Sequence, residues 1–452
     1  MTPARLAAMR VLVAIDAGRT TLSAEVERER PDLPDRRDQG LFLELATGTT
    51  RWRAEIDARL AAHCRRPLAD LTPELRAILR LAAYQLHHLD RIPEHAIVNE
   101  SVELTRAVQQ SRAAGFVNGV LRNLVRARAK PSGLPPRPAD PLDQDAALDY
   151  LSVTLSHPRW LVARWLTRVG FEACERWCRF NNTPPEVTLR PQGISADDLV
   201  LLLREDEVEA TVGQFAGGAV RLPAGALGRV SSYTQHLFSV QDEASQLVAG
   251  AVGAQPGDVV LDVCAAPGGK TVLIDQLIRP RGRVIGGDLR LRRVKLLRTT
   301  LLRANVAPRV LSLNAETGLP FRAIFDRVFL DAPCSGLGTI RRDPDIKWHR
   351  QADDLPRLAA AQLRMLHCSA AVVRPGGALI YATCSSEPEE NEDVVHQFLS
   401  QNASFSLVPI QAPAGVAGEA PLVDASGMLR TLPFAHGLDA FFAVMLVRRD
   451  AA

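Results

Sequence analysis

From residue 239 onward, the chain repeats one pattern, in which a short apolar run ends in a polar or glycine-containing segment and a helix-like stretch follows. The apolar runs are VVLDVCA, RVIGGDL, RVLSLNA, RVFLDAPC, GALIYATCS and FFAVMLVRR. Strands that alternate with helices are typical of a mainly parallel sheet covered on both faces. Open sheets of this kind bind ligands at the carboxyl ends of their strands. We therefore expect an α/β doubly wound, Rossmann-like domain with its site at that edge.

The first 130 residues carry a helical pattern instead. Apolar residues recur every three or four positions, and Thr72-Pro73 has the form of an N-cap followed by proline in the first turn. The segment KPSGLPPRPADP, residues 130–141, holds five prolines and indicates a linker. Mixed strand and helix patterns follow it and indicate a small α+β module. The predicted division is an all-α bundle at 1–130, a linker at 131–145, the α+β module at 146–235 and the α/β domain at 236–452.

Composition and length agree with a soluble, multidomain protein of 452 residues, 46% hydrophobic and 23% charged. The sequence contains no run of about 18 apolar residues, and Asp16 interrupts the apolar stretch near the amino terminus. We therefore expect neither a membrane span nor a signal peptide. Seven cysteines without a framework spacing favour reduced thiols in the cytoplasm. We expect four of them to be small buried apolar residues, because no set of four zinc ligands is visible, namely Cys64, Cys174, Cys178 and Cys368.

Charge is distributed unevenly along the chain. The net charge of +3 does not by itself identify a nucleic-acid binder. Residues 1–130 hold 21 Lys and Arg against 16 Asp and Glu, a net charge of +5, and the remainder is slightly acidic. The basic excess therefore lies in the predicted bundle.

The segment LDVCAAPGGKT, residues 261–271, places a glycine loop between a strand and a helix. Gly268 and Gly269 let backbone amides approach a ligand at the helix amino terminus. A P-loop needs glycine where Cys264 stands, and a dinucleotide fingerprint also lacks its first glycine. Adenosyl binding remains, with Asp288 as a surface carboxylate that accepts hydrogen bonds from ribose hydroxyls. The alternative is a tight turn next to a solvent-facing acid.

Two cysteines follow neighbouring predicted strands. Asp331 and Cys334 lie in LDAPCSGLGT, and Cys384 lies in YATCSS at the end of the next strand. A thiolate with a low pKa is the nucleophile required to add to an electron-poor ring. Each cysteine alone is explained equally well as a buried structural residue, but the pair at adjacent strand ends favours catalysis. The sequence therefore predicts two thiols beside one bound cofactor.

These segments closely resemble the loops of the Sun family of RNA cytosine-5 methyltransferases. The similar segments are CAAPGGKT, DAPCSGLGT, ATCS, QDEASQLV at 241–248, DPDIKW at 343–348 and SHPRW at 156–160. The front, with RLAAYQLHHLDRIPEHAIVNESVEL and GFVNGVLRNL, resembles the NusB-like RNA-binding domain of the family's bacterial small-subunit (16S) ribosomal RNA enzyme. The resemblance implies S-adenosylmethionine as cofactor, small-subunit ribosomal RNA as partner and substrate, and an RNA-recognition role for the α+β module.

The resemblance also assigns roles to single residues. Cys384 would add to carbon 6 of cytosine, Cys334 would assist removal of the hydrogen on carbon 5, and Asp331 would bind the base's pairing edge. In DNA cytosine-5 methyltransferases the Pro-Cys thiol attacks instead, which is the opposite assignment. Lys270 would fix the loop or depress a thiol pKa, or it is only a solvated lysine. The implied cofactor contacts are Cys264, Ala265, Ala266, Pro267, Gly268, Gly269, Lys270, Asp288, Asn314 and Asp331.

Two positions depart from the family pattern. Asn314 stands where an acid near the adenine is common, and Pro191-Gln192 follow Arg190 where an apolar residue and asparagine are usual. Asn314 can still form hydrogen bonds to a cofactor. The change to Pro191-Gln192 leaves undecided whether this chain makes one of the family's RNA contacts. Two alternatives remain at this stage, namely the same reaction on transfer RNA and a non-catalytic RNA-binding factor that keeps the fold. We expect a cytoplasmic monomer without membrane contact or a metal ion.

Overall fold

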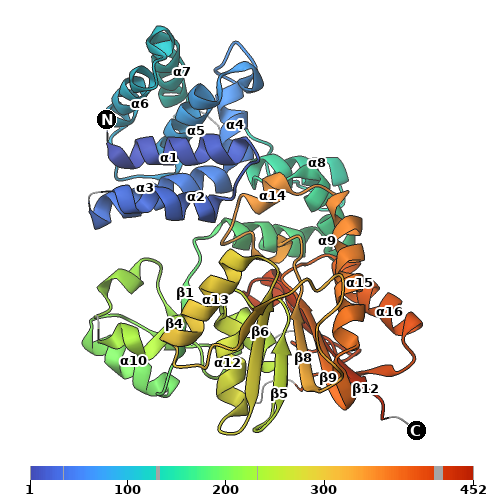
Figure 1. Ribbon diagram of the computed structural model, residues 1–452. Helices are drawn as coiled ribbons and strands as arrows, with labels where there is room; N and C mark the ends of the chain where they lie inside the picture. Colours follow the sequence, from blue (N-terminus) through green and yellow to red (C-terminus); the bar gives the residue numbers. More distant parts are fainter. Residues whose placement is uncertain (1, 34, 129–132, 232, 412–420, 451–452) are drawn as a thin grey trace. The chain divides into compact units, whose positions relative to one another are not determined.

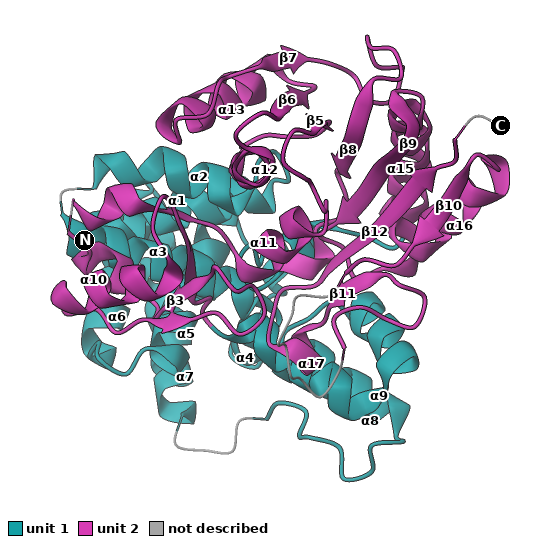
Figure 2. Ribbon diagram, turned by 90° about the horizontal axis from the view of Figure 1, so that it is seen from below, with its two compact units in different colours: residues 1–183, 340–352 teal, residues 184–339, 353–452 magenta. Residues whose placement is uncertain are grey.

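The computed structural model describes residues 2–33, 35–128, 133–231, 233–411 and 421–450. The chain forms two compact units, coloured separately in Figure 2. The first consists of Met1–Thr183 with Ile340–Ala352, and the second of Pro184–Thr339 with Asp353–Ala452. The helices that precede residue 184 therefore group with the amino-terminal bundle, and the strands of the α+β module group with the large sheet. The four-part division given above stays a prediction.

The first unit is almost entirely helical (Figure 1). Its α-helices are α1 Pro3–Asp16, α2 Leu22–Glu29, α3 Arg36–Arg51, α4 Arg53–Ala61, α5 Pro73–His88, α6 Glu94–Ala107, α7 Ala114–Ala127, α8 Gln144–Asp149, α9 Arg159–Asn182 and α14 Ile346–His349. The predicted start of α5 is confirmed, because the Thr72 side chain accepts a hydrogen bond from the Leu75 N–H. The all-α character predicted for this stretch is confirmed, although the sequence pattern did not assign α2 and α3 as individual helices. Helix α3 contains glycines and threonines that disfavour helix, and burial of Phe42 and Leu45 stabilises it instead.

The segment 340–352 belongs to the first unit, although the chain directly before it and directly after it belongs to the second unit. Lys347 is fully buried and donates a hydrogen bond to the Arg51 carbonyl at 2.9 Å. The Trp348 indole N–H donates to the Thr50 carbonyl at 2.7 Å, and Asp345 accepts from the Leu22 N–H at 2.9 Å. A fragment that ends at residue 130 would lack all three partners. The helical bundle is therefore completed by a segment that lies more than 200 residues later in the chain.

The second unit contains a small antiparallel sheet and a large mixed sheet. The small sheet has the order β2-β3-β1-β4, with β1 Val187–Pro191, β2 Thr211–Val212, β3 Val220–Leu222 and β4 Phe238–Val240. Helix α10, Ala196–Glu205, begins after Ser195, whose side chain accepts a hydrogen bond from the Asp198 N–H. Leu199 and Leu203 of this helix pack in one cluster with Leu189 and Val220 of the sheet. This is the α+β module expected from the sequence.

The large sheet has the order β10-β12-β9-β8-β5-β6-β7, with β11 paired to β12. Its strands are β5 Val259–Asp262, β6 Arg283–Asp288, β7 Val310–Ser312, β8 Phe325–Asp331, β9 Val373–Thr383, β10 Phe405–Val408, β11 Leu429–Thr431 and β12 Phe441–Arg448. The five strands from β9 to β7 pair in parallel, and β12 runs antiparallel to β9. All six predicted strands are confirmed, and β10 and β11 are additional.

Helices cover both faces of the large sheet (Figure 1). Alternate strand residues face opposite ways, so Val260 and Ile380 join one apolar cluster while Leu261 and Tyr381 join the other. The first cluster includes residues of α11 Glu243–Gly250, α12 Gly269–Ile278 and α13 Leu291–Arg303, and the second includes α15 Asp354–Ala370 and α16 Glu392–Gln401. A short helix, α17 Pro433–His436, precedes β12. The doubly wound arrangement predicted from the sequence is confirmed.

Two further expectations concern the cysteines and the presence of a membrane-spanning helix. All seven cysteines are free, and Cys174 and Cys178 are buried as expected, whereas Cys64 and Cys368 are only half-buried. Across the described ranges, none of the helices has the length and apolar character that a membrane span requires.

The anchoring of segment 340–352 is testable by removing one of its hydrogen bonds. Asp345→Ala should lower the free energy of unfolding of the first unit by about 1–3 kcal/mol, because the buried Leu22 N–H loses its acceptor. Asp343→Ala is the matched control, since Asp343 accepts a hydrogen bond from the exposed Ser23 hydroxyl and its replacement should therefore cost less. Urea unfolding followed by circular dichroism measures both. Equal losses in the two variants would contradict the proposed anchor.

Candidate active site

The predicted site residues meet at the carboxyl edge of the large sheet. Along this edge the strand order β9-β8-β5-β6-β7 places the strand-end residues side by side. In that order they are Cys384, then Asp331 and Cys334, then Asp262, then Asp288, then Asn314. The two thiols and the glycine loop therefore belong to adjacent strands, as the sequence predicts.

The two thiols are in direct contact. The Sγ atoms of Cys334 and Cys384 lie 3.2 Å apart, and both residues are half-buried. Their strands pair in register, with Asp331 opposite Ala382, so the two loops leave the sheet together. The hydrogen bond to Cys384 and burial raise the pKa of the Cys334 thiol well above its ordinary value. Cys334 therefore holds its proton more strongly than an ordinary cysteine thiol does.

A buried carboxylate fixes both cysteine loops. Glu390 is fully buried and accepts hydrogen bonds from the Ser335 N–H at 2.8 Å and from the Ser335 hydroxyl at 2.5 Å. It also accepts from the Ser385 hydroxyl at 2.5 Å and from the Gln362 amide at 2.9 Å. Each serine directly follows one of the two cysteines. Glu390 was not predicted from the sequence, although it lies in the acidic run EPEENED, residues 387–393, after the second cysteine.

Gly338 supplies a second tie between the loops. Its N–H donates to the Cys384 carbonyl at 3.0 Å, and its own carbonyl accepts from the Ala440 N–H at 2.9 Å. A Cβ at this position would lie 1.9 Å from the Ala440 oxygen, so only glycine fits. The loop after Cys334 is therefore held against the residue that carries the second thiol.

An ion pair lies beside the thiols. The Lys270 ammonium contacts an Asp331 carboxylate oxygen at 2.8 Å and lies 5.4 Å from the ring centre of Phe441. Burial alone would lower the pKa of Lys270, but Asp331, and to a lesser degree negative charge on Cys384, raise it overall. With its side chain only 18% exposed, Lys270 is not a solvated helix-start lysine. It carries a positive charge in contact with the Asp331 carboxylate and within electrostatic range of Cys384.

The glycine loop presents backbone donors. Gly268 has φ +113° and forms the N-cap of α12, and no side chain caps that helix. A Cβ at Gly268 would also lie 2.9 Å from a Leu297 methyl group, so this position requires glycine. Because uncapped amides at a helix amino terminus attract negative charge, the loop favours an anionic ligand group.

Asp262, at the end of β5, is a second residue that the sequence analysis missed. One of its carboxylate oxygens accepts a hydrogen bond from the Thr271 hydroxyl at 2.6 Å. The other is buried and has no hydrogen-bond partner among the described residues. Burial raises the pKa of Asp262 to about 7, although the bond from Thr271 opposes this shift. The unpaired oxygen is an acceptor available to a ligand donor.

Asp288 is buried, at 6% exposure, and is not the surface carboxylate expected from the sequence. It pairs with the Arg293 guanidinium at 3.1 Å, and Arg293 also donates to the Ala266 carbonyl at 2.6 Å. Arg293 therefore ties the end of β6 to the glycine loop, and no sequence signal pointed to it. Asn314 is exposed, and its side-chain oxygen accepts from the Glu316 N–H at 3.0 Å.

Comparison with protein families matches three consecutive parts of the chain. Residues 249–447 match the model of the 16S rRNA methyltransferase RsmB/F. Residues 2–126 match the NusB family, and residues 157–226 match the ferredoxin-like domain of RsmF/B-like methyltransferases.

Individual proteins resemble the chain over most of its length. "Probable ribosomal RNA small subunit methyltransferase B" of Bacillus subtilis is 36% identical over 90% of this chain and 89% of its own. "Ribosomal RNA small subunit methyltransferase B" of Pseudomonas putida is 34% identical over 91% of this chain and 92% of its own. The crystal structure of PH0851 has the same fold, with a TM-score of 0.80, 23% identity and 99% coverage of each chain. The chain therefore belongs to the RsmB/F family of 16S rRNA methyltransferases.

Proposed function

We propose that this chain transfers a methyl group from S-adenosylmethionine to carbon 5 of a cytosine in small-subunit ribosomal RNA. The observation that carries the proposal is the 3.2 Å contact between the Sγ atoms of Cys334 and Cys384 beside the ion pair of Asp331 and Lys270. The relatives named as ribosomal RNA small subunit methyltransferase B support the choice of RNA. The proposal includes action as a monomer in the cytoplasm, without a metal ion.

The residues around the glycine loop fit S-adenosylmethionine. The uncapped amides of α12 suit the cofactor's carboxylate, the unpaired oxygen of Asp262 suits its ammonium group, and Asp288 suits the ribose hydroxyls. Asn314 and the loop from Cys264 to Lys270 complete the set of proposed contacts. When bound there, S-adenosylmethionine supplies an electrophilic methyl group.

Cys384 begins the reaction. Carbon 5 of cytosine is a poor nucleophile, so the Cys384 thiolate first forms a bond to carbon 6 and pushes an electron pair toward carbon 5. That carbon would then take the methyl group, whose bond to the cofactor's sulfonium sulfur breaks and leaves its electron pair on that sulfur. Lys270 favours negative charge on the attacking sulfur, and Asp331 hydrogen-bonds the pairing edge of the base and offsets charge at ring nitrogen 3. The base must leave its stack to reach these groups.

Cys334 completes the reaction. After its thiol has released its own proton to water, the Cys334 thiolate accepts the proton from carbon 5, and the electron pair of the broken C–H bond re-forms the double bond between carbons 5 and 6. The bond between sulfur and carbon 6 breaks, and its electron pair returns to Cys384. The raised pKa of Cys334 makes its thiolate a strong base for this step.

The two thiol roles are separable by mutation. Cys384→Ala should abolish both methyl transfer and any covalent adduct with RNA, because no bond to carbon 6 forms. Cys334→Ala should methylate once and remain attached, so a denaturation-resistant complex should accumulate. A denaturing gel with labelled S-adenosylmethionine and unmodified small-subunit RNA measures both. An adduct from Cys384→Ala and none from Cys334→Ala would reverse the roles, and equal labelling of transfer RNA would reassign the substrate.

The cofactor contacts are testable without RNA. Asp288→Ala should weaken S-adenosylmethionine binding about 10- to 100-fold, because a hydrogen bond to a charged group contributes about 1.5–3 kcal/mol. Asp275→Ala is the matched control. Asp275 is also buried, but it lies in α12 and pairs with Arg279, the C-cap residue of that helix. Calorimetric titration gives the two affinities. Unchanged binding by the Asp288 variant would remove this residue from the cofactor site.

Glu390 acts as a positioning residue in this scheme. Glu390→Gln keeps the size of the side chain but removes its charge and one acceptor atom, so the two loops should lose their common anchor. The rate of adduct formation should fall about a hundredfold, the typical effect of an ångström-scale misplacement. The affinity for S-adenosylmethionine should not change, and the neighbouring Glu389→Gln should behave as the parent chain. A fall in cofactor affinity equal to the fall in rate would indicate general loss of structure instead.

A further inference from the structure

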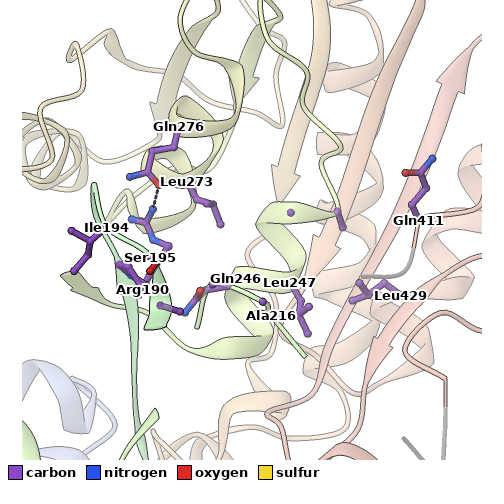
Figure 3. A pocket seen from close by; sticks show the side chains of 16 residues that line it. Arg190, Ile194, Ser195, Ala216, Gln246, Leu247, Leu273, Gln276, Gln411 and Leu429 are labelled. Atoms are coloured by element: carbon purple, nitrogen blue, oxygen red, sulfur yellow. Dashed lines mark hydrogen bonds between the residues drawn. The ribbon is translucent and has the colours of Figure 1, made fainter. Parts of the chain in front are cut away.

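The second unit contains a cavity of about 570 Å³ that the proposed reaction does not use (Figure 3). We call it the arginine pocket. Its lining comes from the small sheet, from α10 to α12 and from the segments around Ala216 and Leu429. Arg190, on β1, contributes the only positively charged side chain of the lining residues.

Arg190 is buried without a counter-ion. It is 3% exposed, and its two terminal nitrogens donate to the neutral oxygens of Gln276 at 2.6 Å and Ser239 at 3.1 Å. Its Nε has no hydrogen-bond partner, and among the described residues no carboxylate pairs with it. Burial lowers the pKa of Arg190 to about 10, so the side chain still carries its charge at neutral pH.

A buried charge of this kind normally has an oppositely charged partner. The guanidinium has five N–H donors, and the structure assigns hydrogen bonds to only two of its three nitrogens. Removing a charge from water without compensation is unfavourable, so buried arginines usually face a carboxylate or a phosphate. A planar guanidinium also matches the geometry of phosphate oxygens. The missing partner is therefore best supplied by an anionic ligand in the pocket.

The rest of the lining suits a nucleoside. Leu247, Ala251 and Leu429 are buried apolar residues that provide walls for a base or sugar. Gln246 and Gln276 provide amide groups beside them, and Figure 3 shows both near Arg190. A mostly apolar cavity of several hundred Å³ with a few polar groups is typical of a small-ligand or nucleotide site. Single-stranded RNA is commonly read by pockets that take one unstacked base each.

Helix α12 connects the arginine pocket to the active site. Its first residues, Gly269 and Lys270, belong to the glycine loop, and Gln276 lines the pocket six residues later. At about 1.5 Å per residue, these positions are about 9 Å apart along the helix axis. Pro191, one of the two departures from the family pattern, also lines the pocket. An RNA strand bound at the thiols therefore has a second pocket within the reach of its neighbouring nucleotides.

We propose that the arginine pocket binds a nucleotide of the RNA substrate other than the methylated cytosine, with the phosphate on Arg190. This inference rests on the proposed function, because it takes the ligand to be part of the same RNA. The shared chemistry is a phosphate attached to a nucleoside, which a free nucleotide also offers.

The first test compares Arg190→Gln with Arg204→Gln, a control that removes an exposed arginine of the same module. With an unmodified small-subunit RNA fragment, Arg190→Gln should raise Kd about tenfold. The slope of log Kd against log salt should also fall by about 0.7, the value for one phosphate of a single strand. Calorimetric affinity for S-adenosylmethionine and adduct yield at saturating RNA should stay unchanged. A Kd and slope equal to those of Arg204→Gln would overturn the proposal.

A second variant keeps the test decisive if Arg190→Gln does not fold. A Cβ at Gly217, which lines the pocket, would meet no atom within 4 Å, so Gly217→Phe should fill the cavity without a backbone clash. It should weaken RNA binding to a similar degree while Arg190 stays in place. Parent-like RNA affinity in Gly217→Phe would contradict occupation of the pocket by RNA.

The final experiments distinguish RNA from a free anion as the source of the phosphate. They also distinguish a failure of this proposal from a failure of the proposed function. Uridine 5′-monophosphate and inorganic phosphate are titrated into the parent chain and Arg190→Gln. Binding that depends on Arg190, together with unchanged RNA affinity in the variant, would assign the pocket to a free anion and overturn the RNA assignment. RNA binding that depends on Arg190 in a chain that transfers no methyl group would support the pocket and contradict the proposed function. Methyl transfer by a chain whose RNA affinity does not depend on Arg190 would support the proposed function and contradict RNA binding in the arginine pocket.

Discussion

The site depends on one buried carboxylate. Glu390 accepts hydrogen bonds from the serine after each cysteine, so the loops that leave β8 and β9 share a single anchor. A buried carboxylate without a cation is stable only when several donors satisfy it, and Glu390 has donors from Ser335, Ser385 and Gln362. This requirement fixes both loops at once. The 3.2 Å contact between the thiols follows from it.

The same loop links the chemistry to the helical unit through the chain itself. After Cys334 the backbone is locked at Gly338, and from Ile340 to Ala352 it belongs to the first unit, where the buried Lys347 and Asp345 hold it. It then returns as α15, whose Gln362 donates to Glu390. The residues that follow Cys334 therefore continue directly into a segment that is anchored in the first unit. The bundle thus has a structural role in addition to the RNA-binding role that its resemblance to NusB implies.

The strands and the site residues at their ends were predicted from the sequence. These features depend on local apolar patterns and on the rule that the carboxyl ends of parallel strands meet at one edge of a sheet. The sequence did not predict Glu390, Asp262 or Arg293, since their partners come from other elements. Ser335 and Glu390, for example, are 55 residues apart. The bounds of helix α3 were not assigned because its glycines and threonines disfavour helix, and packing of Phe42 and Leu45 stabilises it instead. The burial of Asp288 was not predicted because its partner Arg293, which lies in the helix that follows the strand, carries no sequence signal that it covers the strand end.

The central claim is that the sulfur atom of Cys384 forms the covalent bond to RNA. The most direct test uses the parent chain with small-subunit RNA that contains 5-fluorocytosine. Fluorine on carbon 5 cannot leave as a proton does, so the enzyme stays attached after methyl transfer. Mass spectrometry of the digested complex should find the nucleotide on the peptide that contains Cys384. A nucleotide on the Cys334 peptide, or methylation with no attached nucleotide, would contradict the account.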